Sequence, residues 1–244
     1  NLSAKERKLR ESLASSMQAR GEGFLFSDFS TLLEVGRDYL RKDLVNCAGR
    51  VSELLELNFP EEAGTWELSG VTALRMKKMK GAKASFLRAV QYEPLEPKHH
   101  NNLGEVYRQT ESFVEAIRHF REALKLSPVY AKAHHNLGLC KLGQGKPKEA
   151  EKAFRHAVLF DPGHTKAWRK LGVIREEKGL VEEAMAAFGH VLRLNPKEGK
   201  IRERLAALYE SANRLQEALV LLQVGAKLSS LGANGLLRGG RLAY

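Results

Sequence analysis

The 244-residue sequence predicts an all-α fold in which antiparallel helix pairs stack one after another. Three observations predict this class. Small residues, phenylalanine and proline recur in a fixed order with a period of 34 residues. Each period holds two stretches with apolar residues at three- and four-residue spacing, separated by a polar break. No stretch shows the strict alternation of apolar and polar residues that predicts a β-strand.

The repeat units begin at residues 29, 63, 97, 131, 165 and 199. The first unit is degenerate and keeps only a few of the recurring residues. The next four units share a glycine in the first helix, a phenylalanine in the second helix and a proline after it. These residues are Gly70, Phe86, Pro94, Gly104, Phe120, Pro128, Gly138, Phe154, Pro162, Gly172, Phe188 and Pro196. The last unit has Ser230 in place of the proline.

The recurring residue types have mechanical roles in a helix pair. Small residues at one position of each helix let the two helices approach closely. Proline ends the second helix, because it lacks the amide hydrogen and clashes with the preceding turn. The units beginning at 97 and 131 carry His100 and His134 in the slot that holds Trp66 and Trp168 elsewhere. We therefore expect these two histidines to pack rather than to bind a metal.

This order of residues resembles the tetratricopeptide repeat (TPR) family, and the resemblance covers residues 29–232. It implies a right-handed superhelical solenoid of about six repeats, in which the first helices line a concave groove. Residues 1–28 are then an N-terminal region, with a basic helix at 2–20 and an apolar patch of Phe24, Phe26 and Phe29. We expect this region to cap the stack, with docking to another protein as the alternative.

At the other end, residues 233–244 form a glycine-containing tail after a strongly apolar last helix. Either leucines of this tail (Leu236, Leu237 and Leu242) fold back onto the stack, or a partner covers the apolar surface. A second copy of the chain is one such partner, so self-association through the C-terminal repeat is a prediction.

A basic stripe is predicted along the first helices. The second position of four successive units is lysine, and the fifth and sixth positions are rich in amide and basic side chains. The predicted peptide-binding residues are Lys98, Asn101, Asn102, Lys132, His135, Asn136, Lys166, Arg169, Lys170, Lys200 and Arg204. Ammonium and amide groups bind carboxylates, so the stripe favours an acidic peptide. The alternative is a solvated face without a ligand.

Part of this pattern resembles the carboxylate clamp with which some TPR domains hold the acidic tails of heat-shock chaperones. The resemblance assigns clamp roles to Asn136, Lys166 and Lys170. It departs at Asn101, where lysine is expected, and at Glu105, where asparagine is expected. Asn102 and Asn136 also resemble two rungs of the asparagine ladder of O-linked N-acetylglucosamine transferase, which grips the backbone of a peptide.

Composition narrows the function class. The formal net charge of +11 predicts attraction to an acidic partner. The two cysteines, Cys47 and Cys140, lack the spacing of a metal or redox motif, and their reduced state fits a reducing compartment. We expect a cytoplasmic chain without a membrane span, although a targeting segment upstream would not be visible. No motif predicts a metal site, a cofactor or an enzyme.

The sequence therefore predicts a non-catalytic interaction scaffold that binds an acidic peptide or protein segment. One alternative is the TPR region of a larger enzyme, such as a glycosyltransferase. Another alternative is a protein associated with nucleic acid. The aromatic residues argue against it, because most of them are expected to pack within the repeats and few remain to stack on bases. Docking to a membrane surface through the helix from Lys5 to Arg10 is a third.

Overall fold

The computed structural model describes residues 28–240, and the side chains of residues 28–227, as helices joined by short turns. The predicted N-terminal helix, Phe24 and Phe26, and the side chains of the C-terminal tail lie outside these described residues. The chain divides into two compact units, residues 1–144 and 145–244. The unit boundary falls inside the repeat that begins at 131, between its first and second helices.

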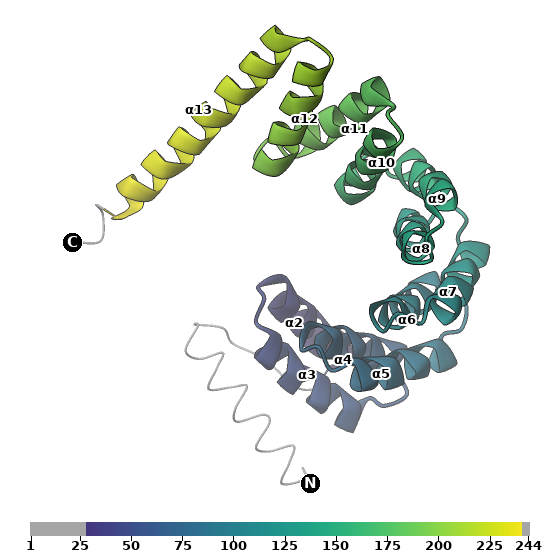
Figure 1. The fold of residues 1–244 in the computed structure, drawn as a ribbon. Coiled ribbons are helices and arrows are strands. Elements are labelled where there is room, and N and C mark those ends of the chain that lie inside the picture. Colours follow the sequence, from purple (N-terminus) through teal and green to yellow (C-terminus); the bar gives the residue numbers. More distant parts are fainter. Residues whose placement is uncertain (1–27, 241–244) are drawn as a thin grey trace. The chain divides into compact units, whose positions relative to one another are not determined.

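In the first unit, consecutive helices pack in antiparallel pairs (Figure 1). Each repeat contributes a first and a second helix, and the second helix also contacts the first helix of the following repeat. The helices are α2 (Phe29–Arg41), α3 (Val45–Asn58), α4 (Ala63–Arg75), α5 (Met79–Tyr92), α6 (Pro97–Gln109), α7 (Phe113–Leu126) and α8 (Ala131–Gly143). The degenerate first repeat is therefore a complete helix pair.

The second unit is built in the same way. Its helices are α9 (Pro147–Phe160), α10 (Thr165–Glu177), α11 (Val181–Leu194), α12 (Gly199–Ser211) and α13 (Leu215–Gly240). Helix α13 continues as one helix past residue 232, where the sequence predicts the last repeat to end. Together the two units confirm the all-α repeat fold over the described part of the chain.

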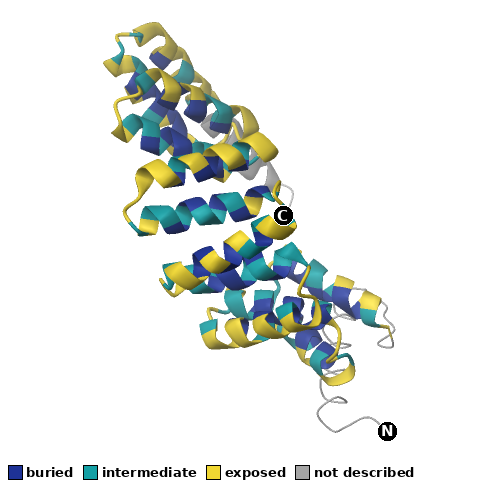
Figure 2. Cartoon of the chain, turned by 90° about the vertical axis from the view of Figure 1, so that its right-hand side faces the viewer, coloured by how far each residue is buried: buried dark blue, intermediate teal, exposed yellow. Residues whose placement is uncertain are grey.

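Phenylalanine rings packed against glycine hold the helix pairs together. Phe120 on α7 is fully buried, and a Cβ atom on Gly104 of α6 would lie 2.7 Å from its ring. Gly172 and Phe188 meet in the same way in the second unit. Because a larger residue would strike the ring, the predicted small residues permit the close helix contact. Figure 2 shows buried residues on the helix faces that are turned toward neighbouring helices.

The turn between the two helices of each repeat contains one residue in the left-handed backbone region, with φ between 58° and 72°. These residues are Asp43, Lys77, Glu111, Gly145, Gly179 and Asn213, and they are spaced by the repeat period. Glycine adopts this conformation without a steric penalty, but four of the six positions hold other residues. The geometry of the turn thus recurs even where its sequence does not.

The starts of the first helices α4, α6, α8 and α10 are each tied to the preceding proline by a side-chain hydrogen bond. The indole Nε1 of Trp168 donates to the carbonyl of Pro162 over 2.9 Å, and Trp66 donates likewise to Pro60. In the intervening repeats, Nε2 of His100 and of His134 makes this bond to Pro94 and Pro128. A carbonyl oxygen only accepts, so both histidines carry their proton on Nε2. The prediction that they take the structural slot of tryptophan is confirmed.

Two further observations bear on surfaces. Among residues 28–240, no helix has both the length and the apolar character needed to cross a membrane.

On α13, Leu222 is 40% exposed, although it occupies the slot in which Phe120 and Phe188 are fully buried. No described helix covers this side of α13, as a further repeat would.

Candidate functional site

The predicted groove residues lie on the first helices of both units, and in the first unit some of them form a hydrogen-bonded cluster. Helices α6 and α8 contact each other directly. Across this contact, Nδ2 of Asn136 donates to Oδ1 of Asn101 over 3.0 Å. Nδ1 of His135 lies 3.2 Å from Oδ1 of Asn136, and Asn101 and His135 are both buried. The structure therefore brings together three of the predicted residues, but it uses Asn136 to bridge two helices.

Glu105, the acidic residue that breaks the clamp resemblance, is neutralised within its own helix. Both of its carboxylate oxygens accept from Arg108, over 2.8 and 2.6 Å, and one also accepts from Gln109 over 2.7 Å. Burial raises the pKa of Glu105, but the hydrogen bonds from Arg108 and Gln109 outweigh it and hold the pKa below its usual range. Sequence reasoning missed Arg108, although its spacing of three residues from Glu105 on one helix is the available signal.

The lysines of the predicted stripe differ in their surroundings. Lys98 on α6 forms an ion pair with Glu67 of α4, and Arg37 of α2 contacts the same carboxylate over 3.4 Å. Lys132 on α8 is exposed and has no acidic partner among the described residues. The first unit therefore offers one free ammonium group at the lysine position.

In the second unit, the two lysines of the stripe are both available. Lys166 on α10 and Lys200 on α12 are exposed, and neither has an acidic partner in the described part of the chain. Their basic neighbours are paired: Arg169 donates to Glu198 over 2.5 Å, and Arg204 donates to Glu176 over 2.5 Å. Arg204 thus links α12 to α10 of the preceding repeat, and Arg169 links α10 to the residue just before α12, while the lysines face solvent.

Two predicted residues have more limited roles. Asn102 is half-buried on α6, and its Nδ2 is enclosed without a hydrogen-bond partner. Lys170 on α10 is half-buried and has no ion pair among the described residues. An enclosed amide cannot serve as an open rung of a peptide-binding ladder, and Asn136 is occupied by Asn101. The asparagine-ladder resemblance is therefore not supported by the positions of these side chains.

Comparison with known proteins identifies the family. Residues 4–234 match the family model described as the cilia and flagella-associated protein 70 C-terminal domain, a TPR domain. The chain belongs to this family. A search among curated protein sequences gave no significant match.

Solved structures with the same fold agree with this family assignment. The APC/C hetero-tetramer Cut9–Hcn1 aligns with a TM-score of 0.70 at 17% identity, over 96% of this chain and 46% of that chain. Pseudomonas aeruginosa PilF aligns with a TM-score of 0.68 at 16% identity, over 82% of this chain and 96% of that one. YrrB, described as a TPR protein with an unusual peptide-binding site, aligns with a TM-score of 0.53 at 20% identity, over 72% of this chain and 90% of that one. At these identities the likeness establishes the TPR fold.

Two features of the titratable residues bear on chemistry in the described part of this TPR domain. No cluster of three histidine, cysteine or acidic side chains suited to a metal ion occurs among the described residues. Cys140 is buried and unpaired, and burial raises the pKa of its thiol to about 12. Since the thiolate is the reactive form, this cysteine is an inert packing residue.

Proposed function

We propose that this chain is a non-catalytic scaffold that binds an acidic segment of a partner protein through the first helices of its repeats. The observation that carries the proposal is the contrast between paired and unpaired cations. Lys98 and Arg204 are neutralised by carboxylates of neighbouring helices, and Arg169 is neutralised by Glu198 just before α12. Lys132, Lys166 and Lys200, which recur at one repeat position, are left exposed without such partners.

Charge accounts for how such a surface would act. An exposed ion pair contributes only about 0.2–1 kcal/mol, so no single lysine would hold a partner. Free lysines in each unit, Lys132 in the first and Lys166 and Lys200 in the second, on a chain with a net charge of +11, would steer acidic segments to the first helices and add small contacts there. The half-buried arginine pairs and the Asn101–Asn136 bridge support rigid first helices, which lowers the entropy lost on binding.

The family assignment supports a cellular setting. Its description names a protein associated with cilia and flagella, and it places the domain at that protein's C-terminus. We therefore propose that the chain is the interaction module of a longer ciliary or flagellar protein, on the cytoplasmic side of the membrane. The YrrB and Cut9–Hcn1 structures, described as having a peptide-binding site and as a hetero-tetramer, support protein binding as the use of this fold.

The test is a capture experiment with charge-reversed variants. The full chain, Lys132→Glu/Lys166→Glu and a control variant are immobilised and incubated with an extract of ciliated cells. The control is Lys80→Glu/Lys148→Glu, which changes the same number of exposed lysines on second helices that also lack acidic partners among the described residues. We expect proteins captured by the wild type to be retained by the control and lost from the groove variant. Equal retention by all three proteins would contradict the proposal.

Two further measurements separate the alternatives. Anisotropy with a labelled oligonucleotide should show only weak binding that disappears between low and physiological salt, because charge alone would drive it. Sedimentation analysis tests self-association through the exposed side of α13, which stays a prediction. Leu219→Ser should leave the sedimentation coefficient unchanged if the chain is monomeric and lower it if that side forms a dimer.

A further inference from the structure

The second unit contains a pocket of about 630 Å³ between α9 and α10 that the lysine stripe does not include. Its apolar part consists of Val158, Leu159, Leu171 and Trp168. Leu171 is fully buried, whereas Leu159 is 68% exposed at the edge. The volume lies within the range of about 300–1,000 Å³ that is usual for ligand sites. The pocket is therefore large enough for an apolar side chain with part of its backbone.

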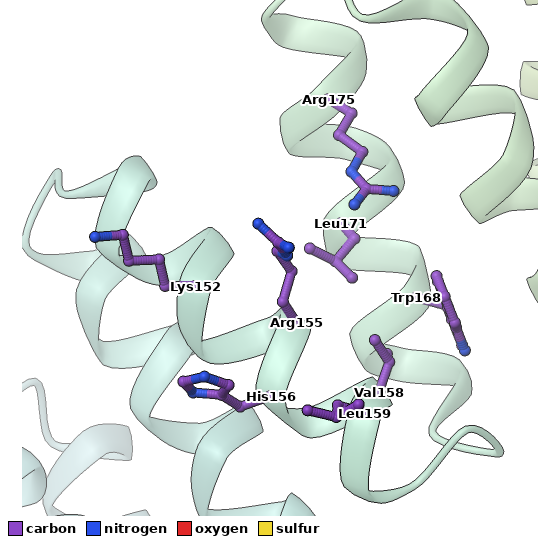
Figure 3. A pocket seen from close by; sticks show the side chains of 8 residues that line it. All are labelled: Lys152, Arg155, His156, Val158, Leu159, Trp168, Leu171 and Arg175. Carbon is purple, nitrogen blue, oxygen red and sulfur yellow. The ribbon is translucent and has the colours of Figure 1, made fainter.

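The other lining residues are all basic or histidine: Lys152, Arg155, His156 and Arg175. Figure 3 shows Arg155 reaching from α9, and Arg175 from α10, toward the space beside Leu171. Lys152 and Arg155 are exposed and have no ion pair among the described residues. Arg175 pairs with Glu151 and Glu183, so the charges open to a ligand with carboxylates are those of Lys152 and Arg155.

The walls of the pocket are held in place by contacts behind them. The Trp168 ring stacks on His190 with a centroid distance of 4.2 Å and an angle of 3°, and its Nε1 donates to Pro162. Nε of Arg175 lies 3.3 Å from a carboxylate oxygen of Glu183. One face of the indole is therefore occupied, which leaves less aromatic surface for stacking a nucleobase. A preformed pocket loses little conformational entropy on binding.

This pocket and the lysine stripe lie on different sides of α10. Trp168, Leu171 and Arg175 recur at three- and four-residue spacing and share one face, whereas Lys166 and Arg169 project from a different one. The pocket-lining stretches of α9 and α10, Lys152–Leu159 and Trp168–Arg175, each extend about 10 Å. That length matches about two turns of a bound helix or three residues of an extended segment.

We infer that this pocket is a second protein-docking site, which takes a short acidic segment of a partner with one leucine-sized side chain between carboxylates. The apolar side chain packs against Leu159, Val158 and Trp168, which are all at least partly exposed, and the carboxylates meet Arg155 and Lys152. Arginine suits this role because its planar guanidinium can hold a carboxylate with two parallel hydrogen bonds. The inference depends on a different set of residues from the proposed groove and stands or falls separately.

The test uses the full chain and two fluorescein-labelled peptides. One peptide has a central leucine flanked by glutamates, and the other has serine in place of the leucine. Binding is measured by anisotropy and located by ¹⁵N amide shifts. We expect the leucine peptide to shift amides of α9 and α10 and to bind at least fivefold more tightly than the serine peptide. Arg155→Glu should weaken binding at least tenfold. Lys148→Glu, an exposed lysine of α9 outside the pocket, should change it less than twofold.

Four results would overturn the inference. Equal affinity for the two peptides would show attraction by charge alone, and displacement by 10 mM inorganic phosphate or by an oligothymidylate would show a general anion site. Equal losses of affinity in Arg155→Glu and Lys148→Glu would show that the peptide does not bind in the pocket. The groove variant Lys132→Glu/Lys166→Glu should retain the leucine peptide, and a loss there would assign the peptide to the groove instead.

Discussion

The same substitution, glycine to alanine, should have opposite effects at two helical positions of the second unit. Gly189 lies on α11, and a Cβ atom added there would meet nothing within 4 Å. Gly172 lies on α10, and a Cβ atom there would lie 2.5, 2.7 and 2.9 Å from three ring atoms of Phe188. Both positions are inside helices, where alanine is favoured over glycine by about 1 kcal/mol.

The magnitudes follow from these distances. At Gly189 only the gain in helix propensity applies, so Gly189→Ala should raise the free energy of unfolding by about 1 kcal/mol. At Gly172 the new methyl group would stand well inside the normal carbon contact distance of about 3.5–4 Å. The Phe188 ring is fully buried and cannot swing into solvent. Overpacking of this kind costs about 1–3 kcal/mol, so Gly172→Ala should be destabilising by up to about 2 kcal/mol.

Urea denaturation followed by circular dichroism measures both variants against the wild type. The double variant Gly172→Ala/Phe188→Leu adds a check, because shortening the ring should relieve the clash and give a favourable coupling of about 1 kcal/mol. If Gly172→Ala stabilises the protein as much as Gly189→Ala does, the glycine–phenylalanine contact does not limit the approach of the helices.

Three further predictions follow from single sites. His119 is buried, and burial lowers its pKa from 6.5 to about 4. The free energy of unfolding should therefore be highest above pH 6.5 and fall by up to roughly 3 kcal/mol toward pH 4. Denaturation of His119→Phe at pH 6.5 and pH 4 should show that this dependence on pH is lost. Glu111 has a φ of 58°, so Glu111→Gly should stabilise the protein by about 0.5–1 kcal/mol. Gly179 has a φ of 72°, so Gly179→Ala should destabilise it by about 1 kcal/mol. Thermal melts in which Glu111→Gly is not the more stable of the two variants would contradict the strain argument. Asp28 caps α2 by accepting a hydrogen bond from the Thr31 amide over 2.9 Å, so Asp28→Ala should destabilise the protein by about 1 kcal/mol. Hydrogen exchange of the α2 amides should then be faster in the variant than in the wild type.

The repeat fold and its close helix contacts could be predicted because each depends on residues within one repeat. A 34-residue period assigns Gly172 and Phe188 to facing positions before any coordinates are known. The same period places His100 and His134 in the slot of tryptophan, and glycines in the polar breaks, such as Gly145 and Gly179, are typical turn residues. It does not mark Lys77 or Glu111, because nothing in these residue types favours a left-handed backbone.

The 34-residue period is sufficient to predict the helix pairs and to assign each lysine of the stripe to a first helix. Which cations are free depends on tertiary contacts, because the carboxylates that neutralise Lys98 and Arg204 come from other repeats and the one that neutralises Arg169 lies 29 residues away, just before α12. Whether such a pair forms depends on distances of a few ångströms between long side chains, and a periodic pattern does not encode these distances. The pocket between α9 and α10 escaped prediction for the same reason, since it arises where side chains of two helices leave space between them.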